Sequence, residues 1–408
     1  MTRRVAVTGM AGITALGDSW VDIEQRLRAR QTAIRRMPEW DGFAELHTRL
    51  GAPVDGFRVP SQYPRKMIRS MGRVSLFAVR ATEAALADAG LADEPIVRSG
   101  RMGIAYGSSS GSVEPVRVFG RMLDSGSMQG VTSTSYIQMM PHTTAVNIGL
   151  FFGCKGRVIP TSSACTSGSQ AIGYAYESIK YGKQVLMIAG GAEELSSPAA
   201  AVFDTLFATS TKNEQPELTP RPFDRARDGL VVGEGAATLI LEDYDHARSR
   251  GARIYAEIVG YDSNADGSHV TQPEATTMGV VMTSALDDAR LSPSAIGYVS
   301  AHGTATDRGD LAESQATAQV LGSRVPISAM KSYVGHTLGA CGAIEAWWGI
   351  EMLSRDWYAP TVNLDEPDPA CAELDHIMGD GRRMSIEHFM SNNFAFGGIN
   401  TSLIFKRS

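Results

Sequence analysis

The sequence predicts an α/β fold in which helices cover both faces of a central sheet. Strand-like and helix-like segments alternate along most of the chain. The run 185–191, VLMIAGG, is apolar without alternation, which is typical of a strand buried on both faces. With 408 residues, of which 43% are hydrophobic, the chain exceeds one ordinary core. Two packed units or one large α/β domain are therefore expected.

Nine short runs of β-branched and apolar residues are predicted as strands, because turn-forming or polar residues bound each of them. The first run fits a strand better than a signal peptide, since the apolar part of MTRRVAVTGMAGIT is short and broken by glycine. In chain order the predicted strands are Val5–Thr8, Met102–Tyr106, Arg157–Pro160, Gln184–Ala189, Ala236–Leu241, Ile254–Tyr261, Ile296–Ala301, Val325–Ser328 and Thr401–Phe405.

Six helices are predicted from apolar residues that recur at spacings of three and four. In the first helix, Trp20, Ile23 and Leu27 fall on one face. Gly90 is a fitting C-terminal stop for the second helix. In chain order the predicted helices are Trp20–Arg28, Arg69–Ala89, Ser169–Tyr181, Thr276–Ala289, Leu311–Leu321 and Ala340–Leu353.

The alternation of strands and helices has one long interruption, Gly107–Lys155. This segment is rich in Ser, Met and Gly, and we expect it to form an elaboration beside the substrate site. A soft boundary near Glu242–Ala252 divides the chain into a first half, residues 1–250, and a second half, residues 251–408. The nucleophile described below lies in the first half and the other chemical groups lie in the second. A site at the seam between the halves is therefore expected.

Composition argues against several classes of function. A net charge of −6 disfavours a general polyanion-binding protein. The four cysteines form no CxxC pair, which argues against structural zinc and thioredoxin-like chemistry. No stretch reaches the roughly 18 apolar residues that a membrane span needs. We expect reduced thiols and a cytoplasmic protein.

Cys165 is the strongest candidate for a nucleophile. The segment Val158–Gln170, VIPTSSACTSGSQ, places it between the end of a predicted strand and the start of a predicted helix, among small residues. Free N–H groups and the positive end of the helix dipole at this place predict a stabilised thiolate. A small buried cysteine packed at a turn is the structural alternative.

Three further motifs carry chemical groups. Ser300–Asp310, SAHGTATDRGD, places His302 at the end of a predicted strand, where α/β sheets commonly hold functional groups. Lys331–Ala343, KSYVGHTLGACGA, contains Lys331 and His336, and Ser391–Asn400, SNNFAFGGIN, reads as a glycine loop with two phenylalanines. Each histidine alone is compatible with a structural, hydrogen-bonded role. A helix-start cysteine together with two glycine-flanked histidines indicates catalysis.

These motifs resemble those of the β-ketoacyl-acyl-carrier-protein synthases, in the Cys-His-His branch of the thiolase-like condensing-enzyme superfamily. The resemblance covers nearly the whole chain. It implies a duplicated αβαβα layered fold, usually a homodimer, with an acyl carrier protein as partner. It implies no metal and no resident cofactor, because the carrier brings the phosphopantetheine arm. The most specific pieces are SSACTSG around Cys165, AGGAEE at 189–194, RPFDRARDGLVVGEGA at 221–236, AHGTAT at 301–306, KSYVGH at 331–336 and NFAFGG at 393–398.

The resemblance also implies a role for individual residues. Cys165 would accept the acyl group, and His302 and His336 would flank the malonyl thioester. Lys331 would support them, and an ion pair between Lys331 and Glu313 would orient the histidines or serve as a structural salt bridge. The other implied site residues are Asp310 beside Glu313, Thr304, Thr306 and Thr271 for the phosphopantetheine arm, Phe396 as gate and backbone N–H donor beside Cys165, and Ser110 and Phe394 for the acyl pocket.

A basic docking patch for the acidic carrier protein is expected. Its candidates are Arg65, Lys66, Arg69, Arg73 and Lys212. The first four also fit an ordinary solvated helix face.

The implied reaction transfers an acyl group to Cys165 and then condenses it with a decarboxylating malonyl unit, which extends the chain by two carbons. The sequence departs from the family pattern at Ser110, Leu230, Asn393, Ala395 and Ile399. These departures, with MPEW at 37–40 and RKMIRSMGR at 65–73, favour a polyene or aryl-polyene pathway over housekeeping fatty-acid synthesis. Three alternatives stay open: a non-decarboxylating thiolase, a non-catalytic partner subunit of the chain-length-factor type, and a Cys-His hydrolase.

Overall fold

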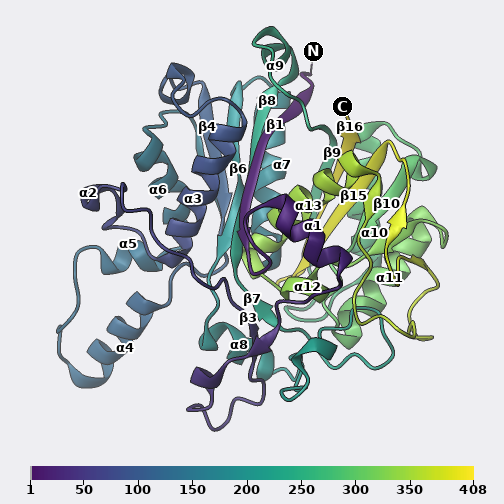
Figure 1. The fold of residues 1–408 in the computed structure, drawn as a ribbon, viewed down its shortest axis with the longest axis horizontal. Helices are drawn as coiled ribbons and strands as arrows, with labels where there is room; N and C mark the ends of the chain where they lie inside the picture. The colour runs from purple at the N-terminus through teal and green to yellow at the C-terminus, as the bar shows by residue number, and fades with distance from the viewer. Residues whose placement is uncertain (1) are drawn as a thin grey trace.

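The computed structural model describes residues 2–408. An 11-stranded sheet with the order β13-β11-β10-β15-β16-β9-β1-β8-β6-β4-β5 forms the centre of the molecule (Figure 1). The sheet consists of two arms, which meet where β1 pairs with β9. The division of the chain near Glu242–Ala252 remains a prediction.

The first arm runs from β1 to β5 of the sheet order. The pairs β1–β8 and β8–β6 are antiparallel, and the pairs β6–β4 and β4–β5 are parallel. The bounds of its strands are Val5–Thr14 for β1, Gly235–Asp243 for β8, Leu186–Glu193 for β6, Met102–Gly107 for β4 and Val158–Thr161 for β5.

The second arm repeats the same pattern. The pairs β9–β16 and β16–β15 are antiparallel, and the pairs β15–β10 and β10–β11 are parallel. A short extra strand, β13 (Asp375–His376), then covers the edge of β11. The other bounds are Ala256–Ala265 for β9, Ile399–Arg407 for β16, His388–Ala395 for β15, Ile296–Ser300 for β10 and Pro326–Ser328 for β11.

Helices complete five layers. α7 (Ser167–Lys180) and α13 (Cys341–Arg355) pack against each other and against strands of both arms, so they form the middle layer. α3 (Arg73–Asp88) covers the outer face of the first arm, and α10 (Ala275–Ala289) with α11 (Asp307–Leu321) covers the second. The predicted thiolase-like αβαβα fold is confirmed.

The apolar pattern of the sequence explains the middle layer. In α7, Ile172, Ala175, Tyr176 and Ile179 are buried, as their spacing predicts. Gly173 allows this helix to approach the second arm closely, because a Cβ at that position would lie 2.1 Å from the ring of Tyr261. A single core cluster therefore joins α7, α13 and both arms.

The segment 107–155, predicted as an elaboration of the fold, contains three helices. They are α4 (Glu114–Ser125), α5 (Ser135–Met139) and α6 (Thr143–Phe152), and the first two project from the left side of the molecule (Figure 1). α6 packs against α3 and β4. None of the three lines the cavity described below.

The largest correction concerns SNNFAFGGIN, because its first half is a strand and not a loop. β15 continues to Ala395, and Asn392 and Asn393 are fully buried within it. Asparagine is depleted in strands, so local preference hid this strand. The second predicted helix also begins later than expected, because residues 69–72 form a non-helical connection between α2 (Arg65–Ile68) and α3.

The remaining elements are short. Helix α1 has the predicted bounds, Trp20–Arg28. The others are α8 (Ser197–Asp204), α9 (Tyr244–Ser249), α12 (Lys331–Val334), the 3-10 turns η3 (Ala164–Thr166) and η6 (Leu338–Ala340), and the strands β2 (Arg35–Arg36), β3 (Leu50–Ala52), β7 (Val232–Gly233), β12 (Trp357–Tyr358) and β14 (Arg382–Arg383). Within residues 2–408, no helix has both the length and the apolar character that crossing a bilayer would require.

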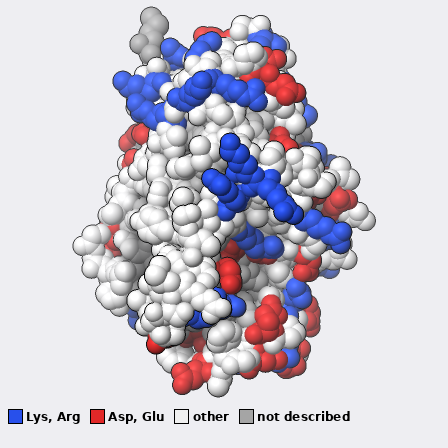
Figure 2. Space-filling model, turned by 90° about the vertical axis from the view of Figure 1, so that its left-hand side faces the viewer, with Lys and Arg blue, Asp and Glu red and all other residues white. Residues whose placement is uncertain are grey.

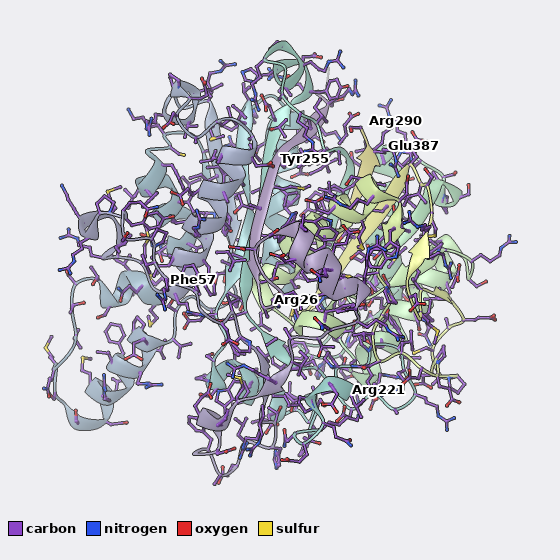
Figure 3. The ribbon with its side chains drawn as sticks, viewed as in Figure 1. Arg26, Phe57, Arg221, Tyr255, Arg290 and Glu387 are labelled. Atoms are coloured by element: carbon purple, nitrogen blue, oxygen red, sulfur yellow. The ribbon has the colours of Figure 1, made fainter. Side chains whose placement is uncertain are left out.

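The strand directions of the second arm point toward the site. Arg290 and Glu387 precede β10 and β15 and mark the upper right end of this arm (Figure 3). The carboxyl ends of both strands therefore lie at the opposite end. In parallel strands this end is where functional groups gather.

Candidate active site

Four segments deliver the site at the carboxyl ends of strands. Cys165 follows β5, and His302 follows β10. Lys331 and His336 follow β11, and Phe394 lies near the end of β15. The sulfur of Cys165 and one ring nitrogen from each of His302 and His336 lie within 4.8 Å of one another. Both arms of the sheet therefore supply groups to one centre.

Cys165 lies in the η3 turn directly before α7, as the sequence predicts, but its thiol is not a stabilised thiolate. The side chain is 5% exposed, and burial raises the pKa of the thiol to about 11. The charge of Lys331 and the backbone N–H groups of Phe396 and Cys165 oppose this effect only in part. The expectation of a lowered pKa is wrong, because burial outweighs the helix start.

His336 faces the sulfur with a protonated nitrogen. Its Nε2 lies 2.9 Å from Cys165 Sγ, and the backbone N–H of Leu338 donates to its Nδ1 at 3.2 Å. Burial, and then the charge of Lys331, lowers the pKa of His336 well below 6.5, so the ring is neutral. A neutral imidazole whose Nδ1 accepts a hydrogen bond carries its proton on Nε2. His336 is thus a donor toward the cavity.

His302 has the same tautomer for the same reason. Its Nδ1 lies 3.2 Å from Lys331 Nζ and 3.4 Å from Asn393 Nδ2. An ammonium group only donates, so Nδ1 is an acceptor and Nε2 carries the proton. Burial, and then the charges of Lys331 and His336, lowers the pKa of His302 well below 6.5. The two imidazole rings meet edge to face, with their centroids 5.2 Å apart.

Lys331 forms its ion pair with Glu345 and not with Glu313. Its Nζ lies 2.5 Å from Glu345 Oε1, and both side chains are almost completely buried. It also donates to the backbone carbonyl of His302 at 2.6 Å. Burial lowers the pKa of Lys331, but Cys341 and Glu345 more than offset this and hold it above the usual value. The predicted partner is wrong, whereas the supporting position beside His302 is as expected.

Glu313 and Asp310 instead hold the backbone of the first histidine motif. Glu313 accepts the N–H groups of His302 and Gly303, both at 2.7 Å. Asp310 accepts those of Phe223 at 2.7 Å and Thr304 at 3.0 Å. Burial raises the pKa of Glu313 to about 8 and that of Asp310 to about 6. Both carboxyl groups act on the site through the chain that carries His302.

Glu193 is a functional candidate that the sequence reasoning missed, although it lies in AGGAEE. Its fully buried carboxylate accepts the N–H groups of Ser109 at 2.7 Å and Gly339 at 3.0 Å. It therefore joins the loop after β4 to the turn that follows His336. Ser110 also binds Glu193, at 3.3 Å, and is exposed instead of lining the cavity. In the single chain, the predicted pocket role of Ser110 has no support.

A cavity of about 430 Å³ opens over the centre. Phe203, Leu206 and Leu230 give it an apolar wall, and Phe207, 85% exposed, lies at its outer end. The oxygens of Thr304 and Thr306 hydrogen-bond each other at 2.8 Å. Of the predicted site residues, the lining includes Cys165, His302, His336, Thr304, Thr306, Thr271, Phe394 and Phe396.

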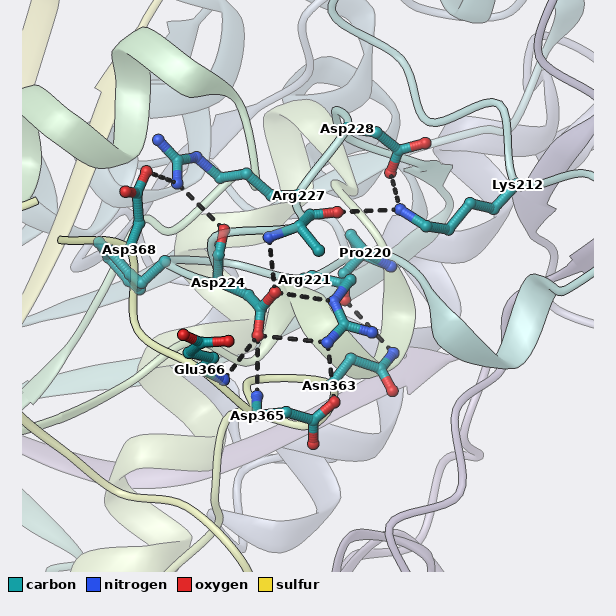
Figure 4. A network of polar contacts seen from close by, with 12 residues as sticks. Lys212, Pro220, Arg221, Asp224, Arg227, Asp228, Asn363, Asp365, Glu366 and Asp368 are labelled. Carbon is teal, nitrogen blue, oxygen red and sulfur yellow. Dashed lines mark hydrogen bonds and ion pairs between the residues drawn. The ribbon is translucent and has the colours of Figure 1, made fainter. Parts of the chain in front are cut away.

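A network of charged residues supports the loop beside this cavity (Figure 4). Asp224 binds Arg221 and accepts the backbone N–H groups of Asp365 and Glu366. Arg227 pairs with Asp368 and lies 3.8 Å from Asp310. The RPFDRARDG motif is therefore tied both to the segment 365–368 and to the carboxylate that holds the Thr304 turn.

The predicted docking residues divide into two groups. Arg65, Lys66 and Arg69 are exposed. Arg73 is bound to the buried carboxylate of Glu234 at 2.7 Å, and Lys212 to Asp228 at 2.8 Å. These two already form ion pairs within the chain, and their role in docking stays a prediction. On the side of the molecule where α2 lies, Figure 2 shows a group of basic side chains beside a broad area without charged side chains.

Cys165, His302 and His336 are donor types that bind zinc. Their arrangement disfavours a cation, however, because both Nδ1 atoms already accept hydrogen bonds and both Nε2 atoms therefore carry protons. Lys331 also places a positive charge beside His302. The centre is better suited to bind an oxygen that gains negative charge.

Comparison with known proteins gives a consistent result. Residues 2–247 match the family described as Beta-ketoacyl synthase, N-terminal domain, and residues 255–365 match Beta-ketoacyl synthase, C-terminal domain. The 3-oxoacyl-[acyl-carrier-protein] synthase 2 of Vibrio cholerae is 37% identical over 413 residues, which cover 99% of each chain.

Two solved structures are similar over 100% of both chains. A Beta-ketoacyl synthase from Burkholderia phymatum has 68% sequence identity and a TM-score of 0.99. The ishigamide ketosynthase/chain length factor has 28% identity and a TM-score of 0.92.

Proposed function

The chain belongs to the β-ketoacyl synthase family, and from this premise we propose how its residues share the condensation reaction. The protein is an acyltransferase of the β-ketoacyl-acyl-carrier-protein synthase class. In our proposal Cys165 accepts the acyl group, and His302 and His336 stabilise the enolate formed from the malonyl unit. The observation that carries this assignment is the pair of Nε2–H groups that converge beside the sulfur.

The first half-reaction loads the acyl chain onto Cys165. The sulfur attacks the thioester carbonyl, and the thiol proton leaves with the sulfur of the carrier arm. Two backbone N–H groups, those of Cys165 and Phe396, already act on the sulfur and would hold the tetrahedral oxyanion. Losing one such donor typically costs about 3–4 kcal/mol. The resting thiol is neutral. It becomes a nucleophile when it loses its proton, and the charge of Lys331 and the Nε2–H of His336 then stabilise the thiolate.

The second half-reaction builds the carbon–carbon bond. The thioester oxygen of the malonyl unit accepts Nε2–H hydrogen bonds from His302 and His336. The carboxylate leaves as CO₂, and the electron pair of the broken carbon–carbon bond stays on the malonyl unit and forms the enolate. The enolate carbon then attacks the acyl carbonyl on Cys165, the carbon–sulfur bond breaks, and the released Cys165 thiolate takes up a proton from water to restore the resting thiol. The low pKa of both imidazoles favours this step, because a neutral donor stabilises the enolate without protonating its carbon.

The alternatives fit the geometry less well. A thiolase needs a second catalytic cysteine, but Cys341 donates to the Cys165 carbonyl and does not line the cavity. Cys371 does not line it either. A chain-length-factor subunit has no need of Cys165 with two donor histidines. A hydrolase does not explain Lys331 buried behind them.

We further propose that an acyl carrier protein docks through Arg65, Lys66 and Arg69 and brings the phosphopantetheine arm past Thr271, Thr304 and Thr306. The arm is thus not a resident cofactor, and no metal is required. We place the reaction in the cytoplasm, where the four free cysteines stay reduced. The chain extended is of the fatty or polyene type.

A second chain is proposed to cover β5, one of the two edge strands of the large sheet. Val158 in this strand is 42% exposed, and an unpaired strand edge is a template for another chain. We propose a homodimer. The alternative is a heterodimer with a related subunit, as in the ishigamide ketosynthase/chain length factor. Ser110 is exposed in the single chain, and we propose that it borders the acyl chain once the partner covers it. Ser110→Ile should then shorten the products.

Incubation with an acyl carrier thioester and malonyl-acyl carrier protein tests the function. We expect CO₂ and a product two carbons longer, with the acyl mass found on Cys165 by intact mass spectrometry. Release of free acid instead would identify a hydrolase. Sedimentation of the wild type against Val158→Lys tests the dimer, since a monomeric wild type would contradict it.

A further inference from the structure

Asn393 lies behind the catalytic histidines, in β15, where it is fully buried opposite Thr401 of β16. Its backbone carbonyl accepts the hydroxyl of Thr401 at 3.3 Å. The side chain points at Glu345, at His302 and, at 3.8 Å, at the sulfur of Cys341, and none of the reaction steps above uses it.

The amide of Asn393 donates to the same two groups as Lys331 does. Its Nδ2 lies 2.7 Å from Glu345 Oε2 and 3.4 Å from His302 Nδ1. Lys331 Nζ lies 2.5 Å from the other oxygen, Glu345 Oε1, and 3.2 Å from the same His302 Nδ1. Four groups therefore form a closed arrangement in which two donors bridge a carboxylate and a ring nitrogen.

The chemistry of its neighbours decides how the amide is turned. With Oδ1 toward Glu345, two acceptor oxygens would face each other, so the NH₂ group must face the carboxylate. Oδ1 is then left without a hydrogen-bond partner in the interior. A buried oxygen without a partner costs free energy of folding. The contribution of Asn393 at this place therefore comes from its two N–H donors and not from its acceptor oxygen.

We propose that Asn393 is a positioning residue which, together with Lys331, holds His302 in the tautomer that presents Nε2–H to the substrate. Its NH₂ group engages Glu345 Oε2 and keeps this charge from drawing the imidazole proton to Nδ1. This inference rests on the proposed function, since only the decarboxylation step needs that proton on Nε2.

The two half-reactions should therefore respond differently to a change at Asn393. Acylation depends on Cys165 and on the backbone N–H group of Phe396, which Asn393 does not contact. Decarboxylation depends on the Nε2–H of His302. In Asn393→Asp the new carboxylate accepts where the amide donated and draws the Lys331 ammonium away from His302 Nδ1, so the proton of His302 moves to Nδ1. In Asn393→Ser one hydroxyl reaches only one of the two acceptors.

The test measures decarboxylation of a malonyl carrier thioester in a Cys165→Gln background and acylation in the Cys165 background. Asn393→Asp should slow decarboxylation by about 10²-fold, the effect of losing one oxyanion donor, and leave acylation nearly unchanged. Asn393→Ser should give an intermediate loss. The matched control is Asn147→Asp, which also replaces a buried, hydrogen-bonded amide but lies in α6, and it should affect both half-reactions alike.

Nitrogen-15 NMR of the histidines gives a readout independent of turnover. His302 should have a protonated Nε2 in the wild type and a protonated Nδ1 in Asn393→Asp. Unchanged tautomers, or equal losses in both half-reactions, would overturn the positioning role. A wild type without any decarboxylation, but with the expected tautomer, would instead refute the proposed function and leave the positioning of His302 established.

Discussion

The two arms of the sheet have the same strand pattern but carry different chemistry at equivalent places. The turn after β5 in the first arm carries Cys165, whereas the turn after β11 in the second carries Lys331. β4 leads into the serine loop that Glu193 holds, whereas its equivalent β10 leads into His302. In the proposed mechanism, one arm supplies the nucleophile, and the other supplies the hydrogen-bond donors and the buried charge.

This difference shows how a duplicated fold forms one asymmetric centre. The middle helices α7 and α13 bring the two sets of strand ends against each other. The outer edges differ as well, because β13 covers β11 while β5 has no such neighbour within residues 2–408. The second arm thus ends in the two-residue strand β13, whereas the first ends in the four-residue strand β5.

The nucleophile of the first arm should give the largest effect. Cys165→Ala should reduce acyl transfer by about 10⁴-fold or more, because the covalent step is lost. Cys165→Gln should also lose elongation but still release CO₂ from the malonyl thioester. If Cys165→Gln lost CO₂ release as well, measured with labelled malonate, the division of labour between the arms would be wrong.

The next largest effect comes from the second arm. His302→Ala should slow decarboxylation by about 10²–10³-fold, since one donor to the enolate oxygen is lost. Acylation of Cys165 should change little, because the hydrogen-bond partner of the sulfur is His336 and not His302. Stopped-flow measurement of both half-reactions checks this, and equal losses would contradict it.

The two arms should also differ in pH dependence. The rate of acylation should rise about tenfold per pH unit in the neutral range. Burial raises the pKa of Cys165 to about 11, and the thiolate fraction increases about tenfold per pH unit below that pKa. Decarboxylation by Cys165→Gln should stay level as the pH falls toward 6. Both imidazole pKa values are lowered well below 6.5, so the neutral Nε2–H form persists there. A loss centred at pH 6.5 would contradict their burial.

The smallest effects concern the basic residues near α2. Arg73→Ala should lower the free energy of unfolding by about 1.5–3 kcal/mol, because Glu234 loses a charged hydrogen-bond partner, and it should leave the KM for the carrier protein unchanged. Arg69→Ala should do the reverse. We expect no loss of stability and a rise in KM of up to about fivefold, in line with an exposed ion pair. Denaturant titration and steady-state kinetics distinguish the two.

Local patterns in the sequence were enough to predict most of the fold. The spacing of Ile172, Ala175, Tyr176 and Ile179 predicts α7 correctly, since the 3.6-residue period alone determines which face a helix buries. β15 escaped this reasoning because half of its residues are polar, among them two buried asparagines. The burial of Asn393 follows from packing against His302 and Glu345, which lie far away in the chain and which no local window contains.

The sequence by itself determined the chemical groups of the site: one cysteine at a helix start, two histidines after strands and a lysine beside them. Only the tertiary structure decided their states and partners. Lys331 pairs with Glu345 and not Glu313, and Cys165 keeps its proton. Ion pairs and pKa values depend on distances and burial, which residues far apart in the chain create together only after they pack.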